Sequence, residues 1–251
     1  GKSWHMFYLV PIVIGLSLGL LGGGGTILAV PALIYIFGFD TKHAIAISLL
    51  VVGASSLITT LTNLYKNKIE LFSILIFGSC SMLSSYLSSR YLAPLISGKV
   101  QLMVFIFLST GVAIHMLRSR QTVKPKQFKK AEKFVLVITL ALLLGVITGI
   151  VGVGGGFLIV PALVIFLNLE MDQAVASSLL IIAMQALTAF AGYLGTITID
   201  YGFAIPFTLM ISLGSLIGSF FSNKIDQALL KKVFAWLLLT VSVGMAISLF
   251  K

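Results

Sequence analysis

Apolar residues fill the chain in long continuous runs that short polar or glycine-rich segments interrupt. The runs do not alternate with a period of two residues, so they predict helices and disfavour a transmembrane β-barrel. Most of them approach about 20 residues, the length that an α-helix needs to cross the hydrocarbon core of a bilayer. We expect helices over 4–21, 26–37, 44–64, 70–91 and 99–117, and then over 133–151, 157–168, 173–193, 201–221 and 229–250.

The composition places these helices in a membrane. Of the 251 residues, 59% are hydrophobic and 10% are charged, and the mean hydropathy is +1.12. A soluble domain carries roughly 25% charged residues, so this chain has too few charges to cover a water-facing surface. We therefore predict an all-α polytopic membrane protein. The run from Met6 to Leu21 is taken as part of the fold, because no small-residue cleavage site follows it.

The chain contains an internal repeat at an offset of 130 residues. The segment GLSLGLLGGGGTILAVPALIYIFG at 15–38 returns without gaps as GVITGIVGVGGGFLIVPALVIFLN at 145–168. This self-similarity predicts a fold built from two homologous halves. The predicted organisation is a first transmembrane repeat over 1–117, a basic cytoplasmic linker over 118–132 and a second transmembrane repeat over 133–251.

Each half carries a glycine cluster, at 22–25 and at 152–156. A glycine inside a helix costs on the order of 1 kcal/mol relative to alanine, so both clusters predict a break followed by a short half-helix. Each half then contains about five helical segments. If each short segment crosses, or reaches across together with its partner, five is an odd number, and the second half is expected to enter the membrane inverted relative to the first.

The charge distribution supports this topology. Seven of the 17 Lys and Arg residues lie in 118–133, which predicts that this loop is cytoplasmic. An inverted arrangement puts twelve cations on that side and a parallel arrangement eleven; the basic loop at 223–232 and the cation-free loop at 194–201 favour inversion. No base-stacking aromatics are interleaved with the cations, so we expect no nucleic acid partner. The expected location is the plasma membrane, meaning a bacterial or archaeal inner membrane.

Broken helices at equivalent positions of two inverted halves are typical of the central site of a secondary transporter. The N-terminal end of a half-helix can hold an anion at membrane depth, because it presents free N–H groups and the positive end of a dipole. The predicted spans contain essentially no charge apart from Arg90 near a helix end. We therefore predict that a small anionic substrate is held by backbone groups and neutral side chains. The predicted substrate-binding residues are Gly22, Gly23, Gly24, Gly25, Gly152, Gly154, Gly155, Gly156, Ser48, Ser55, Asn63, Ser178 and Gln185.

A glycine cluster that is preceded by Gly-x-x-x-Gly, followed by Val-Pro-Ala-Leu and duplicated in one chain resembles the TauE/SafE sulfite exporter family, also called the 4-toluene sulfonate uptake permease family. The resemblance covers essentially the whole chain, and GIVGVGGGFLIVPAL at 149–163 is its most specific segment. It implies a multi-spanning transporter of anionic sulfur compounds, such as sulfite or organosulfonates, in a plasma membrane. The first copy departs from the pattern at Gly23 and Thr26, where the second has Val153 and Gly156.

The leading hypothesis is thus a secondary transporter that moves sulfite or an organosulfonate by alternating access. The alternatives are a transporter or channel for another small substrate, and a membrane scaffold subunit whose glycines only pack helices. No enzyme activity, cofactor or metal site is expected. Cys80 is the only cysteine, which excludes an intrachain disulfide. The Gly-x-Ser-x-Gly sequence at 15–19 matches the pattern of a hydrolase nucleophile, but close packing of helices explains it.

Proton coupling is the remaining candidate chemistry. Glu70, Asp200 and His43 are the residues that could carry it. The acidic residues also coincide between the two copies, Asp40 with Glu170 and Glu70 with Asp200. Each precedes a long apolar run, so helix capping is the favoured role of all four.

Overall fold

The computed structural model describes residues 2–63, 71–118, 130–152, 156–167, 169–222 and 224–249. These residues form helices joined by short connections and include no β-strand, as predicted, and six of the helices are long and apolar enough to cross a membrane. The helices are α1 (Lys2–Leu21), α2 (Ala29–Tyr35), α3 (Thr41–Asn63), α4 (Leu71–Leu87), α5 (Gly98–Arg118), α6 (Lys130–Val151), α7 (Gly156–Phe166), α8 (Met171–Tyr193), α9 (Tyr201–Ser222) and α10 (Gln227–Leu249).

The first glycine cluster differs from the prediction. We expected an unwound break over 22–25, but Gly22–Leu28 forms a 3₁₀-helix, η1, that leads directly into α2. The Thr26 hydroxyl donates to the Gly23 carbonyl at 2.7 Å within this turn, which stabilises it. The interruption is therefore a change of direction at one residue, because Gly22 has a positive φ of +59°. A smaller difference occurs after α4, which continues as a π-helical turn over Ser88–Leu92.

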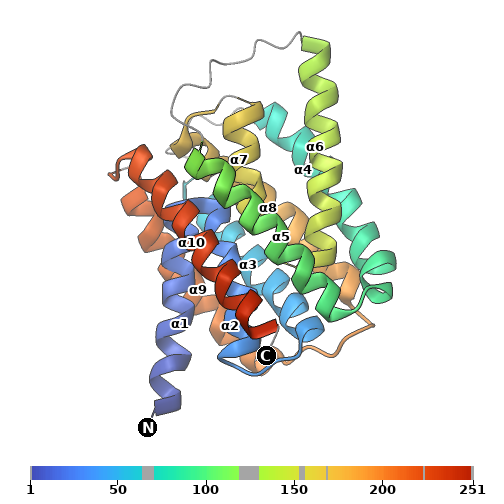
Figure 1. Ribbon diagram of the computed structural model, residues 1–251, viewed down its shortest axis with the longest axis vertical. Coiled ribbons are helices and arrows are strands. Elements are labelled where there is room, and N and C mark those ends of the chain that lie inside the picture. The colour runs from blue at the N-terminus through green and yellow to red at the C-terminus, as the bar shows by residue number, and fades with distance from the viewer. Residues whose placement is uncertain are drawn as a thin grey trace.

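The chain turns back on itself after α1. A groove between the two helices is lined by residues of α1 from Leu9 to Ile14 and by residues from Leu28 to Ile36. Between these two stretches, Gly25 packs against the backbone of Leu18. Figure 1 shows α1 rising from the N-terminus and α2 lying beside it. The short segment therefore returns toward the end from which α1 came and does not continue across the fold.

The two halves are interlocked by matching helix pairs. Helix α1 packs against α9 and helix α6 against α4, while α3 pairs with α8 and α5 with α10. Gly19 of α1 lies against the backbone of Ser215 on α9, and Gly149 of α6 lies against the backbone of Ser85 on α4. These two contacts are equivalent at the repeat offset. Glycine permits both, because a side chain at either position would force the helices apart.

Figure 1 also shows the direction of several helices. Helix α1 runs upward from the N-terminus, whereas α6 begins at the upper end of the view and runs downward. Helices α5 and α10 cross the front of the molecule in opposite directions. The end of α5 and the starts of α6 and α10 all lie in the upper part of the view.

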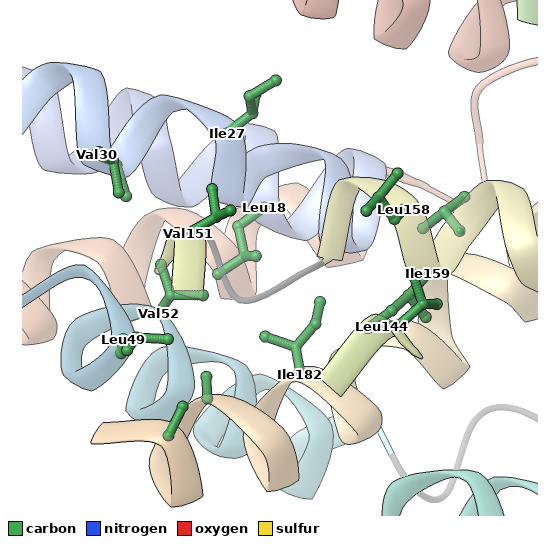
Figure 2. Packing of buried hydrophobic residues seen from close by; sticks show 14 of the residues in the cluster. Leu18, Ile27, Val30, Leu49, Val52, Leu144, Val151, Leu158, Ile159 and Ile182 are labelled. Carbon is green, nitrogen blue, oxygen red and sulfur yellow. The ribbon is translucent and has the colours of Figure 1, made fainter. Parts of the chain in front are cut away.

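The apolar core is shared by both halves. Leu18 and Ile27 flank the first glycine cluster, Val151 precedes the second, and all three side chains are buried. Figure 2 shows Leu18 and Val151 near Val52 of α3 and Ile182 of α8. The segments that change direction thus lie at the centre of the bundle.

The α1–α9 crossing predicts the effect of one methyl group. In Gly19→Ala, the new Cβ would overlap the Ser215 carbonyl oxygen, a backbone atom that cannot move by itself. We expect a loss of about 1–3 kcal/mol, as for other overpacked cores, measured as a lower thermal unfolding midpoint in detergent. The control is Gly111→Ala on α5, where a Cβ meets nothing within 4 Å; equal midpoints for the two variants would contradict the packing role.

Candidate functional site

Two helices end inside the fold at equivalent glycines. Gly22 follows α1 with φ +59° and Gly152 follows α6 with φ +74°. A glycine with positive φ just after the last helical residue is a common helix terminator. The Gly152 N–H donates to the Thr148 carbonyl at 2.9 Å, which completes the end of α6. The negative ends of two helix dipoles therefore lie within the bundle.

The segments that follow these terminators touch each other. A Cβ on Gly23 would overlap the Gly156 carbonyl, and a Cβ on Gly156 would overlap both Gly23 and the side chain of Ile182. Gly156 is the first residue of α7. The first glycine cluster and the start of α7 therefore meet backbone to backbone. Among the other predicted glycines, Gly24 lies within η1, while Gly154 and Gly155 fall outside the described residues.

Two predicted serines bind the breaks reciprocally. Ser178 of α8 accepts the Gly23 N–H at 3.0 Å and donates to the Val175 carbonyl at 2.7 Å. Ser48 of α3 donates to the Gly152 carbonyl at 3.1 Å. Both serines are fully buried. Each one belongs to the helix that follows one break and bonds the break of the other half, so the structure brings these two candidates to the centre.

Ser55 and Gln185, which are equivalent at the repeat offset, occupy helix interfaces. Ser55 donates to the Thr208 carbonyl at 3.3 Å and accepts a hydrogen bond from Ser212 at 3.2 Å, both on α9. The backbone carbonyl of Gln185 accepts the Ser85 hydroxyl of α4 at 3.0 Å. These bonds join α3 to α9 and α8 to α4. The side chain of Asn63, at the end of α3, lies outside the described residues.

Sequence reasoning missed two residues that cap α6. Gln101 of α5 donates from Nε2 to the Ile150 carbonyl at 2.7 Å, and the Tyr193 hydroxyl donates to the Gly149 carbonyl at 3.0 Å. Both side chains are buried. A buried polar residue in an apolar span could have signalled Gln101. The repeat comparison did not, because Lys231 stands at its equivalent position.

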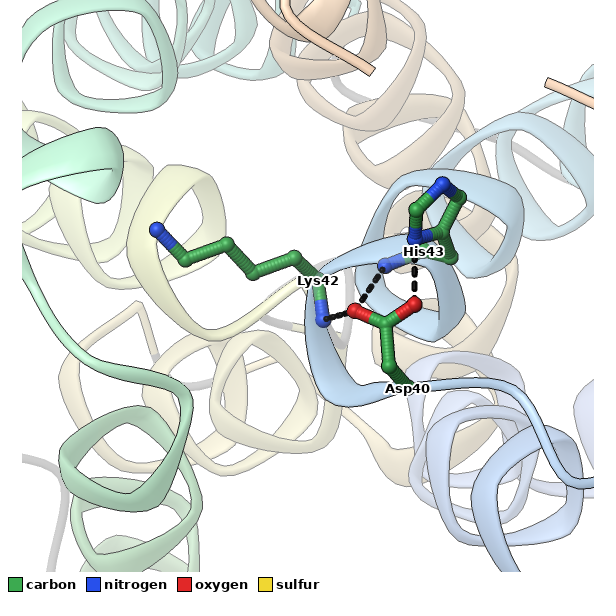
Figure 3. A network of polar contacts seen from close by, with 3 residues as sticks. All are labelled: Asp40, Lys42 and His43. Atoms are coloured by element: carbon green, nitrogen blue, oxygen red, sulfur yellow. Dashed lines mark hydrogen bonds and ion pairs between the residues drawn. The ribbon is translucent and has the colours of Figure 1, made fainter. Parts of the chain in front are cut away.

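The carboxylates at two helix starts act as caps. Asp40 accepts the Lys42 N–H at 3.2 Å, and its other oxygen contacts the His43 ring (Figure 3). Asp200 accepts the Phe203 N–H at 3.2 Å. The capping prediction is thus confirmed for both aspartates. It is wrong for Glu170, whose side chain makes no capping hydrogen bond at the start of α8 within the described residues; the longer glutamate side chain is not among the favoured N-caps.

His43 and Asp200 share a cavity although they are far apart in sequence. Both line a space of about 340 Å³ together with Phe39, Ile47 and Thr198. Ile47 is fully buried, whereas the side chain of His43 is 38% exposed. Two of the three candidates for proton coupling therefore meet at the N-terminal ends of α3 and α9. Glu70, the third, lies outside the described residues.

Known proteins resemble the chain over almost its whole length. The family described as "Sulfite exporter TauE/SafE" matches residues 7–245. A "Probable membrane transporter protein" of Xylella fastidiosa (strain 9a5c) is 31% identical over 236 residues, 92% of this chain and 90% of the relative. The relative in Methanocaldococcus jannaschii, with the same description, is 27% identical over 92% of this chain and 91% of its own. Bacillus subtilis YdhB, which has the same description, is 24% identical over 90% of this chain and 93% of its own length. The family match and these names identify a membrane transporter, and the chain belongs to the TauE/SafE family of membrane transporters.

Proposed function

We propose that this transporter carries an anionic sulfur compound, sulfite or an organosulfonate, across the plasma membrane and binds it at the two glycine breaks. The observation that carries the proposal is the reciprocal bonding of Ser178 to Gly23 and of Ser48 to Gly152. The groups that meet there are neutral hydroxyls, N–H groups and carbonyls. They fit an anion that is bound and released without a fixed counter-charge.

An oxyanion can replace protein partners at the first break. Gly23 now donates to the Ser178 hydroxyl, whose own proton goes to the Val175 carbonyl. A sulfonate oxygen placed between them would accept both the Gly23 N–H and the Ser178 O–H. Hydrogen bonds to a charged acceptor are roughly twice as strong as neutral ones, which offsets part of the cost of removing the anion from water. The N-terminal end of α7 at Gly156 adds a positive dipole beside the same backbone.

The exchange of hydrogen bonds between the halves supports the proposal of alternating access. Each serine holds the opposite break, so the halves cannot separate at one break without disturbing the other. We propose that the halves are inverted repeats, supported by the opposite directions of α1 and α6. The hairpin of α1 and α2 adds no net crossing, and α3, α4 and α5 are then three crossings, still an odd number. A transporter of this kind rocks one repeat against the other around a fixed central site.

The basic end of the molecule is proposed to face the cytoplasm. It comprises the end of α5 and the starts of α6 and α10, which flank the linker and Lys224. Seven of the 17 cations lie in 118–133. Such clusters of Lys and Arg in short loops mark the cytoplasmic side of multi-pass proteins.

A ligand screen tests the substrate class. Only a bound anion stabilises the folded transporter, by RT ln(1 + [L]/Kd), which is about 2.7 kcal/mol at one hundred times Kd. We expect sulfite or an organosulfonate to raise the unfolding midpoint of the purified protein, and chloride at equal ionic strength to leave it unchanged. No shift with any sulfur oxyanion, together with no flux in reconstituted vesicles, would refute the proposed function.

Cysteine labelling tests the topology. In a Cys80→Ser background, Thr196→Cys and Asp226→Cys place single thiols at two exposed positions in loops before and after α9. An impermeant maleimide added to intact cells should label the first and not the second, and permeabilised cells should show both. Labelling of Asp226→Cys in intact cells would reverse the proposed orientation.

Proton coupling, proposed from the cavity shared by His43 and Asp200, has a charge-specific test. Asp200→Asn keeps an acceptor for the Phe203 N–H and removes only the titratable carboxylate. We expect a pH gradient to stop driving accumulation in vesicles while substrate exchange continues. Asp226→Asn, in the loop before α10, is the matched control and should retain gradient-driven flux. Equal gradient-driven flux in both variants would exclude this role for Asp200.

A further inference from the structure

Two buried hydroxyls on α3 lack the bonds that similar residues make elsewhere. Buried hydroxyls in this bundle usually bond to the carbonyl one turn back on their own helix, as Ser109 does to Phe105 at 2.7 Å and Thr148 to Leu144 at 2.9 Å. Ser56 and Thr60 are 0% and 3% exposed. Neither hydroxyl has a hydrogen-bond partner within the described ranges. A buried polar group without a partner carries a desolvation cost, which a ligand that hydrogen-bonds to it would remove.

These hydroxyls continue a row that begins at the break. Ser48, Val52, Ser56 and Thr60 follow one another at four-residue intervals, which forms a ridge along one side of a helix. Ser48 bonds the Gly152 carbonyl. Thr60 is twelve residues further along, about 18 Å at 1.5 Å per residue. The row therefore connects the central break with the C-terminal end of α3.

That end is the basic one. The Ser55 hydroxyl bonds the Thr208 carbonyl and the Thr59 hydroxyl bonds Ser215, so α3 and α9 run in the same direction. The C-terminal end of α9 leads to the exposed Lys224. A positive end raises the local concentration of anions and favours their entry. The row of hydroxyls thus leads from the positively charged end to the breaks.

The second half lacks this feature. The equivalent row on α8 is Ser178, Ile182, Ala186 and Phe190, in which only the serine is polar. The short 194–200 connection makes α8 antiparallel to α9, so this row leads to the opposite end. Repeat symmetry in packing therefore does not explain Ser56 and Thr60.

A third buried hydroxyl, on α1, also lacks a hydrogen-bond partner within the described residues. Ser17 of α1 lies beside Gly25 at the first break. Its buried Oγ also has no partner in the part of the chain that the structure describes. The equivalent residue of the second half is Ile147. All three hydroxyls thus belong to the first half, and the equivalent residues of the second half are apolar.

We propose that Ser56 and Thr60 form an oxyanion subsite between the glycine breaks and the basic end of the molecule. The subsite rests on the proposed function and adds a second stop for the substrate on one side of the central site. Cβ atoms one turn apart on a helix are about 5–6 Å from each other, so the two hydroxyls can donate to different oxygens of one sulfite or sulfonate group.

Removing the two hydroxyls tests whether they bind substrate or only stabilise the fold. In the double variant Ser56→Ala, Thr60→Val, we expect KM for vesicle flux to rise about tenfold or more, as for loss of hydrogen bonds to a charged group. The unfolding midpoint should stay equal or increase, because an unpartnered buried hydroxyl is removed. Ser81→Ala on α4 is the control: Ser81 is fully buried and bonds the Gly78 carbonyl at 2.9 Å, and KM should not change. Ser56→Ala alone serves if the double variant expresses poorly.

The outcomes distinguish the subsite from the proposed function. If the parent protein neither binds nor transports any sulfur oxyanion, the proposed function fails and the subsite fails with it. If the parent transports and the variant has the same KM, only the subsite is wrong. A variant that loses stability and keeps its KM would assign the hydroxyls to packing, which also overturns the subsite.

Thiol accessibility gives an independent readout. In the Cys80→Ser background, Ser56→Cys should react with an anionic thiol reagent added on the linker side, and methanesulfonate or another transported organosulfonate should slow the reaction. Ala186→Cys, at the equivalent buried position of α8, should stay unreactive from either side. Equal reaction rates for the two thiols, or no protection by the substrate, would overturn the subsite.

Discussion

The close approach of two chain breaks at the centre of the bundle governs this structure. Gly23 and Gly156 meet backbone to backbone, and a Cβ on either would overlap the other. The same requirement recurs at the α1–α9 and α4–α6 crossings, where Gly19 and Gly149 touch the backbone of the neighbouring helix. Close packing of small residues drives helix association in a membrane, because apolar side chains gain little from leaving lipid. Glycine therefore holds the two halves together.

Helix ends inside a bilayer also leave backbone groups that water does not reach. Each such group must find a partner within the protein. Here the partners come from the opposite half: Ser178 for the Gly23 N–H and Ser48 for the Gly152 carbonyl. Tyr193 and Gln101 complete the end of α6. Bonds of this kind stabilise the breaks, and in the proposed mechanism an anion replaces some of them, which connects the stability of the fold with the proposed transport.

The repeat is symmetric in packing and asymmetric in polar chemistry. Gly22, Gly24 and Gly25 recur as Gly152, Gly154 and Gly155, and Ser48 recurs as Ser178, whereas Gly23 and Gly156, which touch each other, align with Val153 and Thr26. The halves also differ elsewhere: at the repeat offset, Thr60 aligns with Phe190 and His43 aligns with Gln173. A transporter must distinguish its two sides. Differences between the halves outside the packing contacts are therefore the places where direction, entry and coupling can be encoded.

The sequence alone determined the helical class, the approximate bounds of ten helices, the duplication and the family, because hydropathy and repeated glycines depend only on local order. It also placed Ser48 and Ser178 on the helices that follow the breaks and favoured Asp40 and Asp200 as caps. The tertiary structure decided the return of α2 along α1, the helical turn at Gly23 and the cap by Gln101. It also brought His43 and Asp200 to one cavity. Periodicity cannot supply these features, since in a membrane every face of a helix can be apolar. The rotation and crossing of packed helices determine which faces meet.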